Sequence, residues 1–287
     1  MFAYSSVAKI AQKATEQNTT IGRLVLAHQA EAMEKTPAEL MELMDRQLAV
    51  MEQSAVHGGR KDIRSTSGLT GGDGWRMGQY AAAGSLSGSF CARAIAVALS
   101  VAECNAAMGK IVASPTAGSC GILPGAILPM MEQRGVSRED ACLALVAAGG
   151  IGMVLAQQAS ISGAEGGCQA ECGSAAAMAA AALTHLQGGN AQQCADAAAF
   201  AIMNLLGLVC DPVGGLVEVP CVYRNVGSSG VAFTAADMVL SGICCPIDPD
   251  EVIQAMKEVG DALPASLRET GEGGCAACGS ICARLRL

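Results

Sequence analysis

The stretch Ser174-Ala-Ala-Ala-Met-Ala-Ala-Ala-Ala-Leu-Thr-His185 is almost entirely alanine. Alanine has the highest intrinsic helix propensity, so this stretch predicts a helix whose small side chains let neighbouring helices approach closely. The remaining composition agrees, because 35 glycines accompany only four Phe, three Tyr and one Trp. Closely packed helices are the natural arrangement for such a core.

Helix-start signals recur along the chain. Thr36-Pro37-Ala38-Glu39 is a capping box with proline at the first helical position, and apolar residues follow it at helical spacing. The same kind of signal predicts helix starts at 137–140, 190–193, 234–237 and 248–251. No alternating run of β-branched residues is convincing, and the nearest, at 217–220, is short. We therefore predict an all-α fold, a compact multi-helix domain with glycine-rich interhelical loops.

The chain has 287 residues and shows no clear linker or repeat. We predict one domain over 1–287, with an N-terminal helical subregion at 1–60. Hydrophobic residues make up 51% of the chain, but the longest apolar run, 141–156, is broken by three glycines. It is shorter than the roughly 20 residues that span a bilayer, so it predicts a buried helix and no membrane association.

The net charge and the cysteine content limit the classes of function that the chain can have. The net charge is −8 and no basic patch is visible, which argues against binding to nucleic acid. The N-terminal residues lack the pattern of a secretory signal, so we expect a cytoplasmic protein with reduced cysteines. For 14 cysteines in such a chain, metal binding or catalysis is a better use than disulfide bonding.

Glycine-rich stretches that also contain Ser, Thr, Cys or acidic residues separate the predicted helices. They are 65–73, 114–121, 162–169, 210–215 and 268–274. Loops held between rigid helices commonly carry binding sites, and glycine lets the backbone approach a ligand. One such loop would be read as a tight turn, whereas five of them indicate a site.

Histidine chemistry is poorly supported. The chain has only three histidines, and no metalloprotease, P-loop, dinucleotide or nucleophile-elbow motif is present. His28 and His185 lie in helical stretches, and His57 precedes a Gly-Gly pair that ends a helix. A histidine triad within this chain is therefore not expected.

Three cysteines stand apart from those in alanine-rich core stretches. Cys168, Cys210 and Cys221 each lie in a non-helical stretch rich in glycine or proline. Three thiolates on such irregular backbone suit a 4Fe–4S cluster, although their spacing alone leaves simple core packing open. If the cluster reading is right, the three sulfurs should meet in one pocket. Cys172, which follows Cys168 closely, is read as a packing residue.

The last cysteines, Cys275, Cys278 and Cys282, are ambiguous. Cys275-x-x-Cys278 is the pattern of a redox or zinc half-site, but the chain offers no second such pair with matching spacing. An inert tail is the favoured reading.

Several loops together resemble a known family. The segments STSGLTGGD, NAAMGKIVASPTAGSCGILPGA, ASISGAEGGCQAECGSAAAMAAAAL, LGLVCDPVGGLVEVPCVYRN and LRETGEGG are similar to the alpha chain of iron–sulfur-dependent L-serine dehydratase. The resemblance runs to about Gly274 and covers nearly the whole chain. It implies an all-helical catalytic domain that takes part in amino-acid degradation and gluconeogenesis.

The resemblance also implies a chemistry. The cluster cysteines of the GCQ, CDPV and VPC motifs fall on Cys168, Cys210 and Cys221. The family is a lyase that converts L-serine to pyruvate and ammonia with an iron that polarises the substrate hydroxyl, and without pyridoxal phosphate. For the substrate carboxylate we select hydroxyls and backbone N–H groups at Ser65, Thr66, Thr116 and Gly118; these residues form our predicted substrate contacts.

Two features depart from single-chain relatives. The SSHT-type motif, whose histidine takes part in catalysis there, is absent, so the resemblance implies an obligate beta chain that carries the catalytic base. The tail also differs from the expected pattern, and Cys282 or Cys278 is a candidate fourth cluster ligand. A related lyase acting on L-cysteine and a noncatalytic metal- or redox-binding scaffold remain the alternatives.

Overall fold

The computed structural model describes residues 5–285, except for the side chains of Cys282 and Leu285. Within that range it contains thirteen α-helices and no strand beyond one isolated bridge, so the predicted all-α class is confirmed. The α-helices are α1 (Val7–Glu16), α2 (Ile21–Ala32), α3 (Pro37–Gly58), α4 (Asp73–Ala83), α5 (Gly88–Ala106), α6 (Ile122–Arg134), α7 (Arg138–Gln158), α8 (Gly163–Gly166), α9 (Ser174–Leu186), α10 (Ala191–Met203), α11 (Cys221–Leu240), α12 (Pro249–Ala262) and α13 (Gly279–Leu285).

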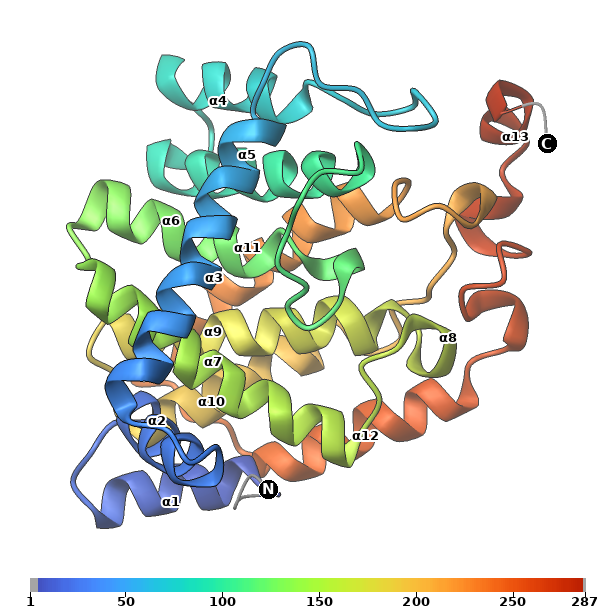
Figure 1. Ribbon diagram of the computed structural model, residues 1–287. Helices are drawn as coiled ribbons and strands as arrows, with labels where there is room; N and C mark the ends of the chain where they lie inside the picture. Colours follow the sequence, from blue (N-terminus) through green and yellow to red (C-terminus); the bar gives the residue numbers. More distant parts are fainter. Residues whose placement is uncertain (1–4, 286–287) are drawn as a thin grey trace.

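The alanine-rich helix α9 forms the centre of the molecule. Its residues from Ser174 to Thr184 are all buried, and it packs against α6, α7, α10 and α11 (Figure 1). Small side chains make this possible, because each neighbour can approach the α9 backbone on a different side. The predicted close-packed helix is confirmed.

Most of the predicted helix starts are also confirmed. Thr36 and Glu39 form a complete capping box at the start of α3, and Asn190 and Gln193 form another at α10. Ser137 caps α7 and Asp248 caps α12, each through its side-chain oxygen. These caps satisfy backbone N–H groups that have no partner within the helix.

The predicted helix start at 234–237 is wrong, because α11 already begins at Cys221. The stretch before Thr234 is rich in glycine and serine, which resembles a loop in sequence. In the fold, Asn225, Ser228 and Ser229 are buried, and α11 packs on α5 and α9. Tertiary packing therefore outweighs the weak local propensity.

Two helices, α5 and α7, are long and apolar enough to cross a membrane by length and composition. In each, 67% of the apolar window is buried inside the protein, so packing in the core accounts for their composition. Helix α7 contains the apolar run that predicted a buried helix.

Candidate active site

Three separate segments bring the predicted cluster cysteines together. Cys168 precedes a π-helical turn (η2, Gln169–Gly173) that leads into α9, and Cys221 is the first residue of α11. Cys210 lies in an extended stretch whose backbone pairs with Leu267 and Glu269. All three thiols are buried, and each is close enough to the other two to interact with them electrostatically. Their role as metal ligands stays a prediction.

The thiols differ in how firmly they hold their protons. The sulfur atoms of Cys168 and Cys172 lie 3.3 Å apart, within hydrogen-bond distance. This contact lowers the pKa of Cys168, and the nearby Arg224 guanidinium acts in the same direction. Burial raises the pKa of Cys221 to about 12, and burial followed by the Glu171 carboxylate raises that of Cys210. Because thiolates are the metal-binding form, Cys168 is the best prepared of the three.

The spacing of the donors does not suit a single metal ion. Within residues 5–285, no three side chains of His, Cys, Asp or Glu gather tightly enough to hold one ion. In an iron–sulfur cluster each cysteine binds a different iron, so its sulfurs lie farther apart than the ligands of one ion. Thiolate donors serve both zinc and iron–sulfur clusters, so the cluster stays a prediction.

A buried ion pair between Arg224 and Asp211 lies beside the predicted cluster cysteines. The Nη2 atom of Arg224 lies 2.6 Å from Oδ1 of Asp211, whose side chain is 2% exposed, and Nη1 donates to the carbonyl of Val209 at 2.6 Å. Arg224 follows Cys221 by three residues and Asp211 follows Cys210 directly. The pair therefore joins the segments that carry two of the three predicted ligands.

Glu171 is a site residue that our sequence reasoning missed. Its Oε1 accepts a hydrogen bond from the Thr116 hydroxyl at 2.7 Å, and its Oε2 lies 3.9 Å from the Cys210 sulfur. Burial raises the pKa of this carboxyl. A Cβ at Gly163 would lie 2.8 Å from both the Cys210 sulfur and Oε2, so only glycine leaves room for them. Its sequence signal was an acidic residue three positions after a predicted ligand.

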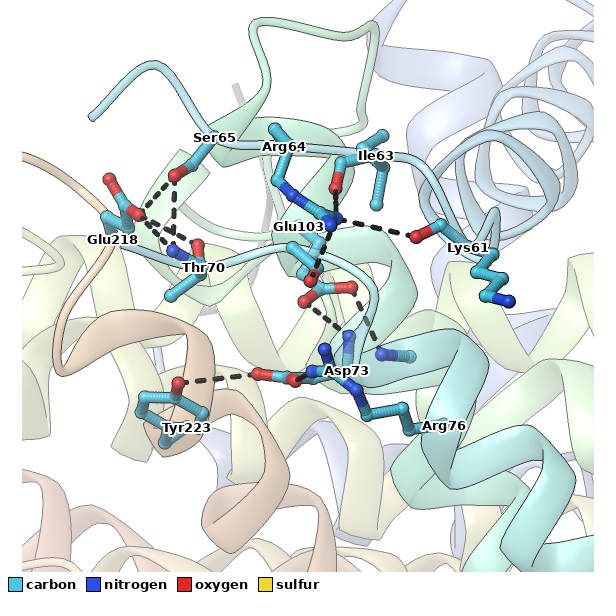
Figure 2. Close-up of polar contacts among 12 residues, drawn as sticks. Lys61, Ile63, Arg64, Ser65, Thr70, Asp73, Arg76, Glu103, Glu218 and Tyr223 are labelled. Carbon is cyan, nitrogen blue, oxygen red and sulfur yellow. Dashed lines mark hydrogen bonds and ion pairs between the residues drawn. The ribbon is translucent and has the colours of Figure 1, made fainter. Parts of the chain in front are cut away.

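The first predicted substrate loop is fastened by another carboxylate, that of Glu218. This side chain is 3% exposed and receives the Ser65 hydroxyl and the hydroxyl and amide of Thr70 (Figure 2). It also receives the Ser67 hydroxyl. Thr66 is bound differently, since its amide and hydroxyl both donate to the carbonyl of Ala106. The polar groups of this loop thus already have protein partners, and substrate contact by Ser65 and Thr66 stays a prediction.

The far end of the same loop is held by Glu103. Its carboxylate, on a side chain that is 1% exposed, accepts the amides of Asp73 and Gly74 at 2.9 and 3.0 Å, where α4 begins (Figure 2). Burial raises the pKa of Glu103. A carboxylate at a helix N-terminus satisfies orphan N–H groups and opposes the positive end of the helix dipole.

The second predicted substrate loop is joined to Cys221. The Asn225 amide group donates to the carbonyls of Gly118 and Cys221 at 2.7 and 2.8 Å, and its oxygen accepts the amide of Gly121 at 2.8 Å. Gly118 also lies against Glu171, because a Cβ there would be 3.0 Å from Oε1. The structure therefore brings Thr116 and Gly118 to the cysteine pocket.

The tail passes beside the pocket. The amide of Cys275 donates to Oδ2 of Asp211 at 2.6 Å, next to Cys210. Cys278 is exposed, with its thiol 3.9 Å from the carbonyl of Gly274. The side chain of Cys282 lies outside the described residues. A fourth ligand from the tail stays a prediction.

Comparison with known proteins agrees with this arrangement of loops. Residues 16–276 match the family described as "Serine dehydratase alpha chain". The chain is 46% identical over 275 residues to a protein of Bacillus subtilis named "Probable L-serine dehydratase, alpha chain", covering 96% of this chain and 91% of that one. It is 41% identical over 273 residues to the "L-serine dehydratase, alpha chain" of Peptoniphilus asaccharolyticus, covering 95% and 94%. This chain belongs to the serine dehydratase alpha-chain family.

A longer relative shows how the matched segment is used elsewhere. "L-serine dehydratase 1" of Escherichia coli is 46% identical over 182 residues, which are 62% of this chain and 40% of that protein. In that relative, the larger part of the chain lies outside the matched segment.

Proposed function

We propose that this chain is the iron–sulfur subunit of an L-serine ammonia-lyase. In the proposed reaction serine loses its α-proton and its hydroxyl as water, and leaves aminoacrylate. Aminoacrylate then tautomerises and takes up water to give pyruvate and ammonia. The observation that carries the proposal is that the Cys168, Cys210 and Cys221 thiols, in a chain of this family, are all buried and near enough to one another to interact electrostatically.

The donor set fits a 4Fe–4S cluster held by the three thiolates. Cys168, Cys210 and Cys221 would hold this cluster, which would supply Lewis-acid polarisation of the poor leaving group, hydroxide. The protein keeps these sulfurs away from bulk water, since none of the three residues is more than 7% exposed. Arg224 places a positive charge next to Cys168 and favours its thiolate.

The chain's polar groups orient the substrate in this proposal. The loop at Thr116 and Gly118 reaches the pocket and supplies backbone donors for the serine carboxylate. Glu171 lies between this loop and Cys210 and offers a carboxylate to the substrate ammonium group. In this proposal the loop at Ser65 and Thr66 also lines the substrate site, while its own hydroxyls stay hydrogen-bonded to the protein.

The catalytic base comes from a partner chain in this proposal. The two long relatives that match over nearly this whole chain are named alpha chains, and the single-chain relative has a large additional part. We place the complex in the cytoplasm, which agrees with the thirteen described cysteines all being free.

Anaerobic reconstitution with iron and sulfide tests the cluster. Wild type should bind about four irons per chain and absorb broadly in the visible range. Cys210→Ala should lose most of the iron and the colour. Cys194→Ala is the matched control, because Cys194 is equally buried but lies within α10; this variant should keep both.

Iron uptake that is absent, or equal in Cys210→Ala and wild type, would refute the three-cysteine site and favour the scaffold reading. With the cluster loaded and the beta chain added, pyruvate formation from serine is measured in the presence of L-cysteine as a competing substrate. Faster turnover of cysteine than of serine would assign the lyase to cysteine instead.

A further inference from the structure

Glu218 is a buried acid without a role in the proposed chemistry. It lies in the stretch Leu216-Val-Glu-Val-Pro220, where it is the single charged residue. Its carboxylate is 3% exposed, yet within residues 5–285 it forms no ion pair, and its hydrogen-bond partners are hydroxyl or amide donors from the loop 65–70. Burying a charge is costly unless hydrogen bonds compensate for it, and here four donors do so.

Both oxygens of this carboxylate take part. Oε1 receives the Ser65 hydroxyl and, at 2.9 and 2.8 Å, the amide and hydroxyl of Thr70, while Oε2 receives the Ser67 hydroxyl at 2.6 Å. Figure 2 shows the Ser65 and Thr70 donors converging on Glu218 from the two arms of the loop. The carboxylate therefore fixes the shape of the loop as well as its place.

Glu218 lies close in the sequence to the predicted ligand Cys221, so its contact with the loop also bears on the position of that cysteine. Cys221 follows three residues later, after Val219 and Pro220, and its helix then presents Asn225 to the other loop at Gly118. Within the segment 218–225, Glu218 thus contacts the first predicted substrate loop and Asn225 contacts the second. The predicted ligand Cys221 lies between them in the sequence. A shift of this segment would move the loops and the Cys221 sulfur together.

We infer that Glu218 is a positioning residue, which sets the distance between the loop 65–70 and the metal end of the site through Cys221. The inference rests on the proposed function. In this inference Ser65, Ser67 and Thr70 bind the Glu218 carboxylate, and these hydrogen bonds hold the loop backbone in one fixed position facing the substrate.

The test uses the full chain, loaded anaerobically and combined with its beta chain, as wild type and Glu218→Gln. The amide of Gln has nearly the same shape but offers one acceptor oxygen in place of two and carries no charge. Depending on which oxygen is replaced, either the Ser67 hydroxyl or the Ser65 hydroxyl and both Thr70 donors lose their acceptor, and the remaining hydrogen bonds are no longer charge-assisted. Hydrogen exchange of the peptide covering 65–71 should rise about tenfold, the size expected for one lost charge-assisted hydrogen bond. Exchange in α9 should not change.

Iron content and steady-state kinetics separate positioning from simple stability. Glu218→Gln should keep the iron and visible spectrum of wild type, raise KM for serine about tenfold and change kcat much less. Glu218→Asp, which keeps both acceptor oxygens on a shorter arm, should recover part of the KM. Glu258→Gln is the control, because Glu258 is exposed on α12; it should behave as wild type.

Ser67→Ala provides a milder variant if Glu218→Gln folds poorly, because it removes one hydroxyl donor to Oε2. It should raise exchange at 65–71 and KM in the same direction by a smaller factor. Unchanged exchange and KM in both variants would overturn the inference, as would loss of iron on Glu218→Gln. If wild type binds no iron or does not turn over serine, the proposed function fails instead, and hydrogen exchange still decides whether Glu218 orders the loop.

Discussion

The loop 65–74 and the cysteine pocket contain the same kinds of groups but satisfy them differently. In the loop, four donors saturate Glu218 and two backbone amides bind Glu103. In the pocket, Glu171 receives one hydroxyl and one weak thiol contact.

This difference indicates which region is scaffold and which is site. Buried polar groups are normally paired, so a fully paired loop needs no ligand to be stable. Acceptor and donor capacity left over in a buried pocket is available to a ligand. The comparison therefore predicts that buried carboxylates and their partners stabilise both regions. It also predicts that the side-chain hydrogen bonds of the loop stay unchanged when substrate binds, whereas those of the pocket change.

The largest effect is expected from breaking the ion pair of the pocket. Arg224→Leu leaves the Asp211 carboxylate buried without its partner, which should lower the free energy of unfolding by about 3–5 kcal/mol. Urea denaturation of the metal-free chain measures this. Adding Asp211→Asn should restore part of the loss, and a loss below about 1 kcal/mol would show that the pair behaves like a surface ion pair.

A smaller loss is expected at the end of the loop. Glu103→Ala removes the acceptor of the Asp73 and Gly74 amides, which should cost about 1–3 kcal/mol of unfolding free energy. The control is Glu132→Ala, which breaks an exposed pair with Arg93 and should cost no more than about 1 kcal/mol. Equal losses in the two variants would contradict the idea that the loop depends on its buried carboxylates.

The smallest effect is expected in the pH dependence of stability, which tests whether Glu103 titrates differently in the folded and unfolded states. Burial raises the pKa of this carboxyl above its ordinary value of 4.5, so the folded state holds the proton more tightly than the unfolded state does. This contribution to stability is fully present below pH 4.5 and is lost as pH rises through the folded pKa. In Glu103→Gln that part of the pH dependence should be missing, as measured by urea midpoints from pH 4 to pH 8. An unchanged profile would mean that Glu103 does not titrate differently on folding.

Local signals in the sequence predicted much of the fold. The caps at Thr36, Ser137, Asn190 and Asp248 are read from neighbouring residues, and the alanine stretch needs only its own composition. The start of α11 was missed because its first half is stabilised by packing on α5 and α9, which no local pattern encodes.

The site was predictable only where residue type carries the chemistry. Local context and the family resemblance both point to Cys168, Cys210 and Cys221, and the structure places these three buried thiols near one another; their role as ligands stays a prediction. Glu218 and Asn225 carry no such mark, and the loop residues that each of them binds lie more than 100 residues away in the chain. A single glutamate between valines in an apolar stretch is the only hint that a buried carboxylate needs donors from elsewhere.

The contacts of the segment 218–225 determine which residues must change together in evolution, and which must be grafted together into another protein. A hydroxyl lost at position 67 or 70 leaves Glu218 short of a donor, and a change at 218 leaves hydroxyls without their acceptor. The smallest portable unit is therefore larger than a three-cysteine motif. It comprises both predicted substrate loops together with the stretch from Glu218 to Asn225. A graft of the cysteines alone would carry the predicted ligands without the contacts that join them to these loops.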